Sequence, residues 1–173
     1  MRAMKDRAAA PAVVEAVSLS TFDSLAYRRP LAEYAGIERR GVVIEGYIKH
    51  MLRAPDDDTH LEVTATPPVA GGPMAYVTAE ITPQWHRGAK HWSFESLRAA
   101  FRAASWGGAT LWSDPARRVR LTGWLLYDFD FDPRRPDLTR EPAAQRVSGW
   151  ELHPVTRIEI WDEARAAFVE VPR

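Results

Sequence analysis

The fold of this chain is indicated by residues 59–82, which read THLEVTATPPVAGGPMAYVTAEIT. Apolar and polar side chains alternate through 59–66 and again through 75–82, and the run PPVAGGP separates the two segments. Alternation with a period of two is typical of β-strands, whereas Pro and Gly favour turns. The stretch therefore predicts two antiparallel strands joined by a loop centred near Ala70.

The same alternation predicts how the two strands pair. A register symmetric about the loop places Leu61 opposite Ala79 on the face that would be buried. It also places His60 opposite Glu80 on the other face, where opposed side chains lie about 5 Å apart. A slip of one residue would mix the apolar and polar faces, so the pattern itself favours this register.

Further strand-like segments lie on either side of this hairpin, together with one helix. Ser93 is a suitable N-cap for that helix, and Phe94, Leu97 and Phe101 follow it at helical spacing. The expected elements are strands at 41–49, 59–66, 75–82, 117–127 and 149–161, with the helix near 93–103. This order, mainly β with a helix between strands three and four, predicts a five-stranded Greek-key barrel of the OB type. Another small β-barrel or sandwich is the alternative.

Two parts of the chain lie outside this pattern. Residues 1–40 carry short helix signals, such as Pro30 at a first turn and Gly36 at an end, and predict an N-terminal helical extension. Residues 41–173 then form the OB-like domain. Within it, 128–148 is rich in Asp, Pro and Arg, and a connection of this length is expected to be functional or mobile.

Composition excludes several classes of site. The chain has 173 residues, 46% of them hydrophobic, and it contains no Cys, which rules out disulfides, thiolate metal sites and a cysteine nucleophile. No apolar run approaches the ~18 residues of a membrane span, and the start of the chain lacks the apolar run of a signal peptide, so we expect a cytoplasmic protein with no membrane partner. Lys plus Arg equals Asp plus Glu at 23 each, a balance that argues against strong binding of phosphate backbones.

The predicted register gathers titratable side chains on one face. Glu62 shares the face of His60, and in an OB barrel the last strand closes beside the third. Glu151 and His153 of that strand then face outward beside Glu80. Two imidazoles and several carboxylates suit acid–base chemistry or a divalent metal, and His60, Glu80 and His153 are the candidates for both roles. The alternative is the polar, solvated outer face of any small barrel, with an ordinary His60–Glu80 ion pair.

A weaker signal combines arginines with aromatic residues. Single-stranded nucleic acid is held by basic grooves in which aromatic side chains stack on the bases. The arginines are Arg117, Arg118, Arg120, Arg134, Arg135, Arg140 and Arg146, and the aromatics are Tyr47, Tyr76, Trp85 and Trp112. The alternative is a solvated surface balanced by Asp128, Asp130, Asp132 and Asp137. The candidate ligand-binding residues are Tyr47, Glu62, Tyr76, Trp112 and Glu151.

The segment WELHPVTRIEIW, residues 150–161, resembles a bacterial family of uncharacterised proteins with a WEIHPV-like motif near the C-terminus. The resemblance extends over LAEYAGIERRGVVIEGYIK, DTHLEV, VTAEITPQW and VRLTGWLLYD, and thus over most of the chain from Leu31 onward. It implies kinship with that family but no activity, and it assigns no role to a residue.

Three function classes follow from these observations. The first is an OB-type binding module for an oligomeric ligand, with single-stranded nucleic acid as the candidate, whose site is flanked by the loops joining strands one to two and four to five. The second is a metal-assisted hydrolase that uses the His and Glu cluster. The third is a structural or partner-binding protein.

Overall fold

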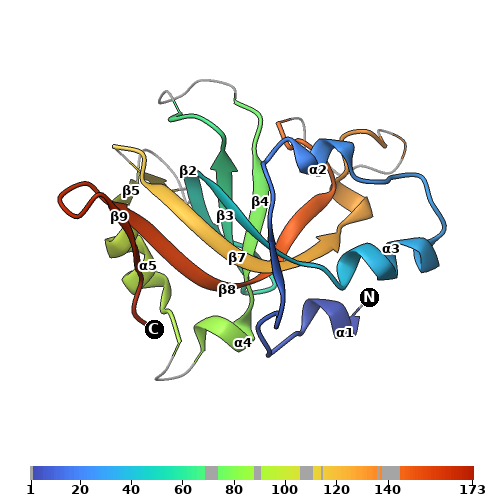
Figure 1. Cartoon of the computed structure of the whole chain (residues 1–173), viewed down its shortest axis with the longest axis horizontal. Helices are drawn as coiled ribbons and strands as arrows, with labels where there is room; N and C mark the ends of the chain where they lie inside the picture. The colour runs from blue at the N-terminus through green and yellow to red at the C-terminus, as the bar shows by residue number, and fades with distance from the viewer. Residues whose placement is uncertain are drawn as a thin grey trace.

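The structure is a computed structural model that describes residues 2–68, 74–87, 91–105, 111–113, 115–135, 137 and 145–173. Its centre is a closed barrel (Figure 1) of five strands: β2 (Gly41–Arg53), β3 (Thr59–Thr64), β4 (Val77–Ile81), β7 (Arg118–Tyr127) and β8 (Trp150–Asp162). The strands follow the order β3-β4-β8-β7-β2, and pairing of β3 with β2 closes the ring. Only β4 and β8 run parallel among these pairs. This is the predicted OB-like Greek-key barrel.

The predicted pairing of the central hairpin is confirmed. His60 lies opposite Glu80 and Leu61 opposite Ala79, as the alternation requires. The apolar members of this register are fully or almost fully buried, and they join one core cluster. The last strand lies beside the third, since Ala79 of β4 pairs with Leu152 of β8.

The first strand curves so that it pairs with two neighbours. β2 pairs with β7 through residues 41–47 and with β3 through residues 47–53. Gly46 lies at this change of partner, where a Cβ atom would collide with the Thr64 carbonyl and the Val63 side chain. Glycine therefore permits the close approach by which β2 closes the barrel.

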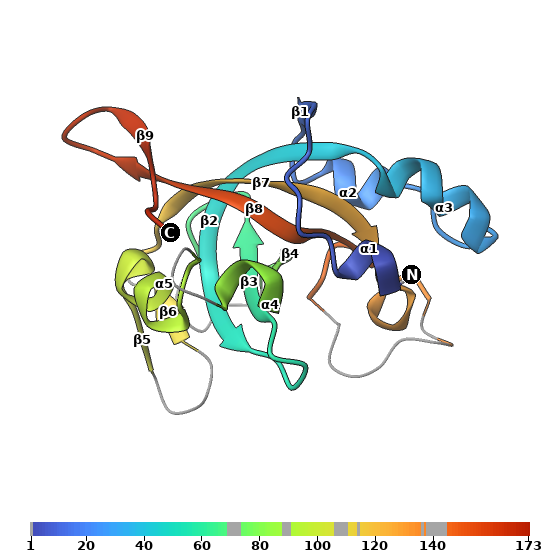
Figure 2. The ribbon, with the colours of Figure 1, turned by 90° about the horizontal axis from the view of Figure 1, so that it is seen from below.

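The predicted helix forms as α5 (Phe94–Phe101), between the third and fourth barrel strands. Ser93 caps it, because its hydroxyl accepts a hydrogen bond from the Ser96 N–H while the Ser96 hydroxyl accepts one from the Ser93 N–H. Leu97 and Phe101 are fully buried in the core. Figure 2 shows α5 toward one end of the barrel and the N-terminal helices toward the other.

The N-terminal segment contains short helices, as predicted, and in addition one short strand that was not predicted. It contains α1 (Arg2–Lys5), α2 (Thr21–Ser24) and α3 (Leu31–Glu38), but residues Val14–Ala16 form β1, which pairs in parallel with Gly41–Val43. The first half of β2 is paired with β7 on one edge only, so its other edge offers backbone hydrogen-bonding groups that β1 satisfies. Phe22 and Tyr34 enter the same core as the barrel.

Several short elements were not predicted: α4 (Pro83–His86), β5 (Ala103–Ser105), β6 (Leu111–Ser113), a 3-10 turn at Phe129–Phe131, and β9 (Ala167–Glu170). β6 extends the sheet beside β2, and β9 forms a hairpin with β8. Among the helices of the described ranges, none is long and apolar enough to cross a membrane.

The described parts of the 128–148 connection pack against the N-terminal segment. The Ser148 hydroxyl donates to the Phe22 carbonyl at 2.8 Å, and an Arg134 guanidinium nitrogen donates to the Asp23 carbonyl at 2.7 Å. Asp132 is fully buried and accepts a hydrogen bond from the Tyr127 hydroxyl. These parts have a packing role, whereas residues 136 and 138–144 lie outside the described residues.

Candidate functional site

The predicted cluster forms on the side of β3, β4 and β8 that faces away from the core. Glu80, Glu151 and His153 are nevertheless buried, and the side chain of His60 is 27% exposed. The alternative of an ordinary solvated barrel face is therefore wrong for this region. The reason is that other segments of the chain cover these three strands.

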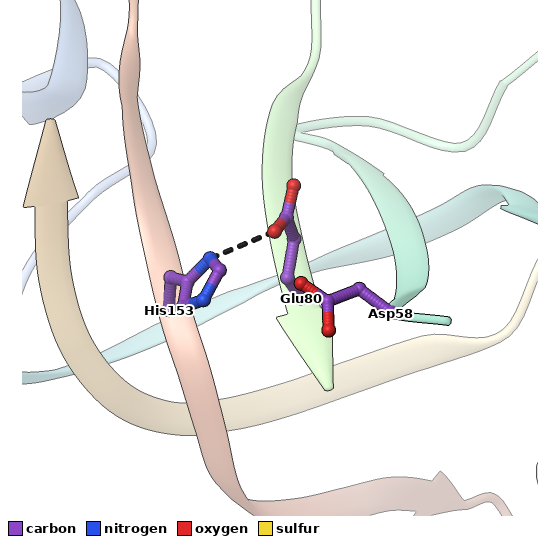
Figure 3. Close-up of side chains that lie close together, drawn as sticks. All are labelled: Asp58, Glu80 and His153. Atoms are coloured by element: carbon purple, nitrogen blue, oxygen red, sulfur yellow. Dashed lines mark ion pairs between the residues drawn. The ribbon is translucent and has the colours of Figure 1, made fainter. Parts of the chain in front are cut away.

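Glu80 connects the two imidazoles of the cluster. His153 Nδ1 lies 2.7 Å from Glu80 Oε2 (Figure 3), and His60 Nε2 lies 3.0 Å from Glu80 Oε1. The same Nδ1 lies 3.0 Å from Glu151 Oε1, so two carboxylates share one imidazole N–H. The structure thus brings together all three residues predicted as catalytic or metal-binding, with Glu151 beside them.

The local backbone of β8 is irregular where it carries His153. The pairing with β7 shifts on both sides of Gly123, and the His153–Pro154 peptide bond is cis. A Cβ atom at position 123 would collide with the Pro154 carbonyl. Glycine at this position lets β8 approach β7 closely next to the imidazole.

The cover of the cluster comes from three segments distant in sequence. Arg146 follows the undescribed part of the 128–148 connection, and its guanidinium donates to Glu151 Oε2 at 2.8 Å. Lys5 of α1 lies near the carboxylates of Glu151, Asp128 and Glu80, whose charges outweigh the effect of burial and raise the pKa of its ammonium group. Asp58, at the end of the loop between β2 and β3, is buried beside them.

The charges of the cluster are matched around Glu80. Burial alone would raise the pKa of Glu80, but His153 and His60 hold it well below its usual range. Burial alone would lower the pKa of His153, but the charge of Glu80 and hydrogen bonds to Glu151 and Glu80 raise it to about 10. The pKa of His60 is raised as well, because Glu80 outweighs its burial. His153, with a pKa of about 10, therefore carries a proton on both ring nitrogens at neutral pH in the metal-free protein.

Two carboxyl groups at the edge of the cluster behave in the opposite way. Burial, followed by the charge of Glu80, raises the pKa of Asp58 to about 7. Burial, followed by the charge of Glu151, raises the pKa of Asp128 to about 6. Carboxyl groups with such values exchange protons near neutral pH, which general acid–base catalysis requires and which buried carboxyls also show without catalysis.

The three groups best placed for a metal ion are Asp58, Glu80 and His153. Their candidate ligand atoms all lie within 4.8 Å of one another. In Figure 3 the two carboxylates and the imidazole converge from three different segments. This group shares Glu80 and His153 with the predicted metal set and contains Asp58, whereas His60 forms an ion pair with Glu80; the predicted metal role of His60 stays a prediction.

The remaining predicted ligand-binding residues have different surroundings. Glu62 accepts a hydrogen bond from His50 Nδ1 at 2.6 Å and lies 3.7 Å from the Lys49 ammonium, so it belongs to a neighbouring polar group. Tyr76 is buried under Lys49, whose ammonium lies 5.1 Å from the ring centroid. Tyr47 is half-buried, and the side chain of Trp112 lies outside the described residues.

The predicted basic aromatic groove does not form as expected. Trp85 is buried in the core beside Trp92 and offers no stacking surface. Four of the six described arginines form ion pairs with the chain's own carboxylates: Arg118 and Arg120 with Glu45, Arg134 with Asp132, and Arg146 with Glu151. Arg140 lies outside the described residues. Paired guanidiniums are less available to phosphates, in agreement with the net charge of zero.

Two surface clefts of the described chain lie elsewhere. One, of about 970 Å³, runs between the segment around β1 and the outer surfaces of β2, β7 and β8. The other, of about 640 Å³, lies between α5 and the β8–β9 hairpin. Neither is lined by a member of the His and Glu cluster, whose residues Glu80, Glu151 and His153 are buried and whose most exposed member is His60.

Comparison with known proteins gives no family. No family model and no curated protein matches the chain. Among solved structures, the chain is similar to Entamoeba histolytica asparaginyl-tRNA synthetase in complex with asparaginyl-adenylate, with a TM-score of 0.44 and 15% identity over 86% of this chain. A second structure of that synthetase gives a TM-score of 0.43 and 14% identity over 86% of this chain. In both cases the match spans 24% of the synthetase chain, and similarity at this level carries no argument about function.

The sequence reasoning missed four members of the site: Lys5, Asp58, Asp128 and Arg146. A signal existed for Asp58, because it precedes His60 by two residues and therefore shares its face of the strand. Lys5 and Arg146 lie in segments without strand periodicity. Their positions could not be deduced from local pattern.

Proposed function

We propose that this chain is an OB-type binding module that holds an oligomeric ligand against the accessible part of the outer face of β3 and β4, around His60. The observation that carries the proposal is the group of buried, hydrogen-bonded charges on that face. OB folds bind oligonucleotides and oligosaccharides on this face, between the loop joining strands one and two and the loop joining strands four and five. Here those loops supply Asp58 on one side, and Asp128 and Arg146 on the other.

The cost of this arrangement supports a functional role. Burying charged groups is expensive even when they are paired, and apolar side chains of similar size often stabilise a fold as well or better. Glu80, Glu151 and Arg146 all have side chains no more than 7% exposed. A network of this kind, on the face that OB folds use for binding, supports recognition of a polar ligand.

Single-stranded nucleic acid is the oligomer to test first. Balanced charge and internally paired arginines limit the number of phosphates that the protein can neutralise. We therefore expect weak binding that falls as salt concentration rises, because neutralised phosphates release counterions. His60 is the exposed member of the cluster and is the side chain that an oligomer would contact.

The test uses a fluorescent single-stranded DNA of about 12 nucleotides, within the usual site size of an OB fold. We expect a Kd of about 10⁻⁴–10⁻⁶ M by fluorescence anisotropy at about 25 mM salt, with clear weakening at about 200 mM. His60→Ala should weaken binding severalfold. His91→Ala, the same substitution outside that face, should not. Absence of binding at low salt, or binding that ignores both salt and His60, would contradict the nucleic-acid proposal.

A second candidate is metal-assisted hydrolysis, and one specific observation favours it. His153 Nε2 is buried and has no hydrogen-bond partner among the residues described, although Asp58 and Glu80 lie next to the ring. A divalent ion held there would polarise a bound water and lower its pKa. The enclosed position of the cluster places it second.

A further inference from the structure

We propose that Asp58, Glu80 and His153 bind one divalent transition-metal ion, with His153 bound through Nε2. This site would lie beneath the ligand-binding face and does not depend on which oligomer, if any, the module holds. Two independent observations carry it: the convergence of three ligand atoms from three segments, and a buried imidazole nitrogen that lacks a partner.

The unpartnered nitrogen is the more informative observation. His153 is fully buried, and its Nδ1 is held by Glu80 at 2.7 Å and by Glu151 at 3.0 Å. Nε2 of the same ring has no partner in the described chain. A metal ion that binds at Nε2 displaces the proton from this nitrogen and leaves the Nδ1 hydrogen in place, which gives the neutral form in which histidine binds metals.

The surroundings of His153 match the outer shell of known metal sites. A metal-bound histidine usually donates its other N–H to a carboxylate, which fixes the ring and its tautomer. Glu151 is placed for this, because its other oxygen is held by Arg146 at 2.8 Å. With Glu151 retaining the Nδ1–H, Glu80 can leave Nδ1 and turn toward the Nε2 side of the ring to bind the ion.

The donor set indicates the class of ion. One imidazole nitrogen and two carboxylates, with no thiolate, suit Zn²⁺, Mn²⁺, Fe²⁺ or Co²⁺ better than Mg²⁺ or Ca²⁺, which prefer oxygen ligands alone. Ligands about 2.0–2.2 Å from zinc lie about 3–3.5 Å apart. The candidate ligand atoms of the three residues lie within 4.8 Å of one another, but Glu80 Oε2 lies on the Nδ1 side of the ring, so Glu80 has to turn toward Nε2 to complete the site.

The experiment uses the full chain after exhaustive dialysis against a chelator and then against metal-free buffer. Isothermal titration with zinc chloride should give one ion per chain with a Kd of about 1 µM or tighter, and magnesium chloride should give no comparable binding. Asp58→Asn should weaken zinc binding at least about tenfold. Asp56→Asn, in the same loop but exposed, is the matched control and should leave binding unchanged.

Substitution of the buried His153 could disrupt folding, so a second measurement tests its role in the unsubstituted protein. In the unsubstituted protein, long-range ¹H–¹⁵N spectra should show one buried imidazole whose Nε2 resonance shifts on zinc addition. The proposal is overturned if zinc does not bind, if Asp58→Asn binds as tightly as the control, or if no buried imidazole responds. Since no oligomer is present, any of these results leaves the binding-module proposal untouched.

Discussion

At the scale of single residues, the carboxyl groups of the site divide into two kinds according to their neighbours. Glu80 is buried between two imidazoles, which hold its pKa well below the usual range. Asp58 is also buried and Asp128 is partly buried, but both lie closer to carboxylates, and their pKa values rise to about 7 and about 6. Loss of contact with solvent thus raises the pKa of Asp58 and Asp128 but not that of Glu80, because two imidazoles compensate the charge of Glu80 and the cations near the other two do not suffice.

Asp128 allows this difference to be measured through stability. Its pKa rises from 3.8 to about 6 on folding, so the folded state favours the protonated form. Its contribution is therefore fully present below about pH 4 and is lost as the pH rises through about 6. We expect Asp128→Asn, which stays neutral, to match the natural protein near pH 4 and to exceed its unfolding free energy by about 1–2 kcal/mol at pH 8.

Urea denaturation at several pH values from 4 to 8 measures this difference. The Asn side chain keeps an oxygen to accept the hydrogen bond that Asp128 receives from the Asp130 N–H. A difference between the two proteins that does not change with pH would contradict the assignment.

At the scale of elements, the short segment before β8 decides whether the outer face of the barrel is covered. Residues 145–147 run beside Tyr76, whose N–H donates to the Gln145 carbonyl and whose carbonyl accepts from the Val147 N–H. This pairing continues the parallel contact of β4 with β8. It positions Arg146 over Glu151, and the fully buried carboxylate is thereby neutralised.

Removing one partner of this buried pair should therefore be costly. We expect Arg146→Met to lower the unfolding free energy by about 3–5 kcal/mol, because it leaves Glu151 charged and buried without its guanidinium. The double variant Arg146→Met/Glu151→Gln should recover most of this loss. Urea denaturation of the two single variants and the double variant measures the coupling. Additive effects would show that the two side chains do not act as a pair.

At the scale of the whole molecule, the site is enclosed and the surface charge is balanced. The two clefts described above lie away from the cluster, and most of its members are buried. A buried site of this kind is suited to holding an ion, or to fixing the side chains of the barrel face that contacts a ligand. Turnover of a substrate would require the cover that includes Lys5 and Arg146 to open.

Because the site is enclosed, a hydrolysis assay distinguishes the binding-module proposal from the hydrolase proposal. We expect the zinc- or manganese-loaded chain to hydrolyse bis(p-nitrophenyl) phosphate no faster than the metal salt alone, measured by release of nitrophenolate. Turnover that disappears in Asp58→Asn and persists in Asp56→Asn would instead establish the hydrolase.

The register of the central hairpin could be predicted because strand alternation is a local property of the sequence. Burying Leu61 and Ala79 on one face necessarily places His60 against Glu80 on the other, whatever surrounds the strands. The order of the elements predicted that β8 lies beside β4, which places His153 next to Glu80. The sequence did not predict β1. Its pairing with β2 depends on a free edge of β2 that exists only once the barrel has formed.

By itself, the sequence determined the barrel, its register and the gathering of His60, Glu80, Glu151 and His153 on one side of three strands. Only the tertiary structure decided that this side is buried and that Lys5 and Arg146 lie over it. It also decided that the candidate ligand atoms of Asp58, Glu80 and His153 lie close together. The physical reason is separation along the chain. Alternation fixes the direction of a side chain within its own strand, whereas the cover comes from segments without periodicity, whose positions depend on packing against the finished barrel.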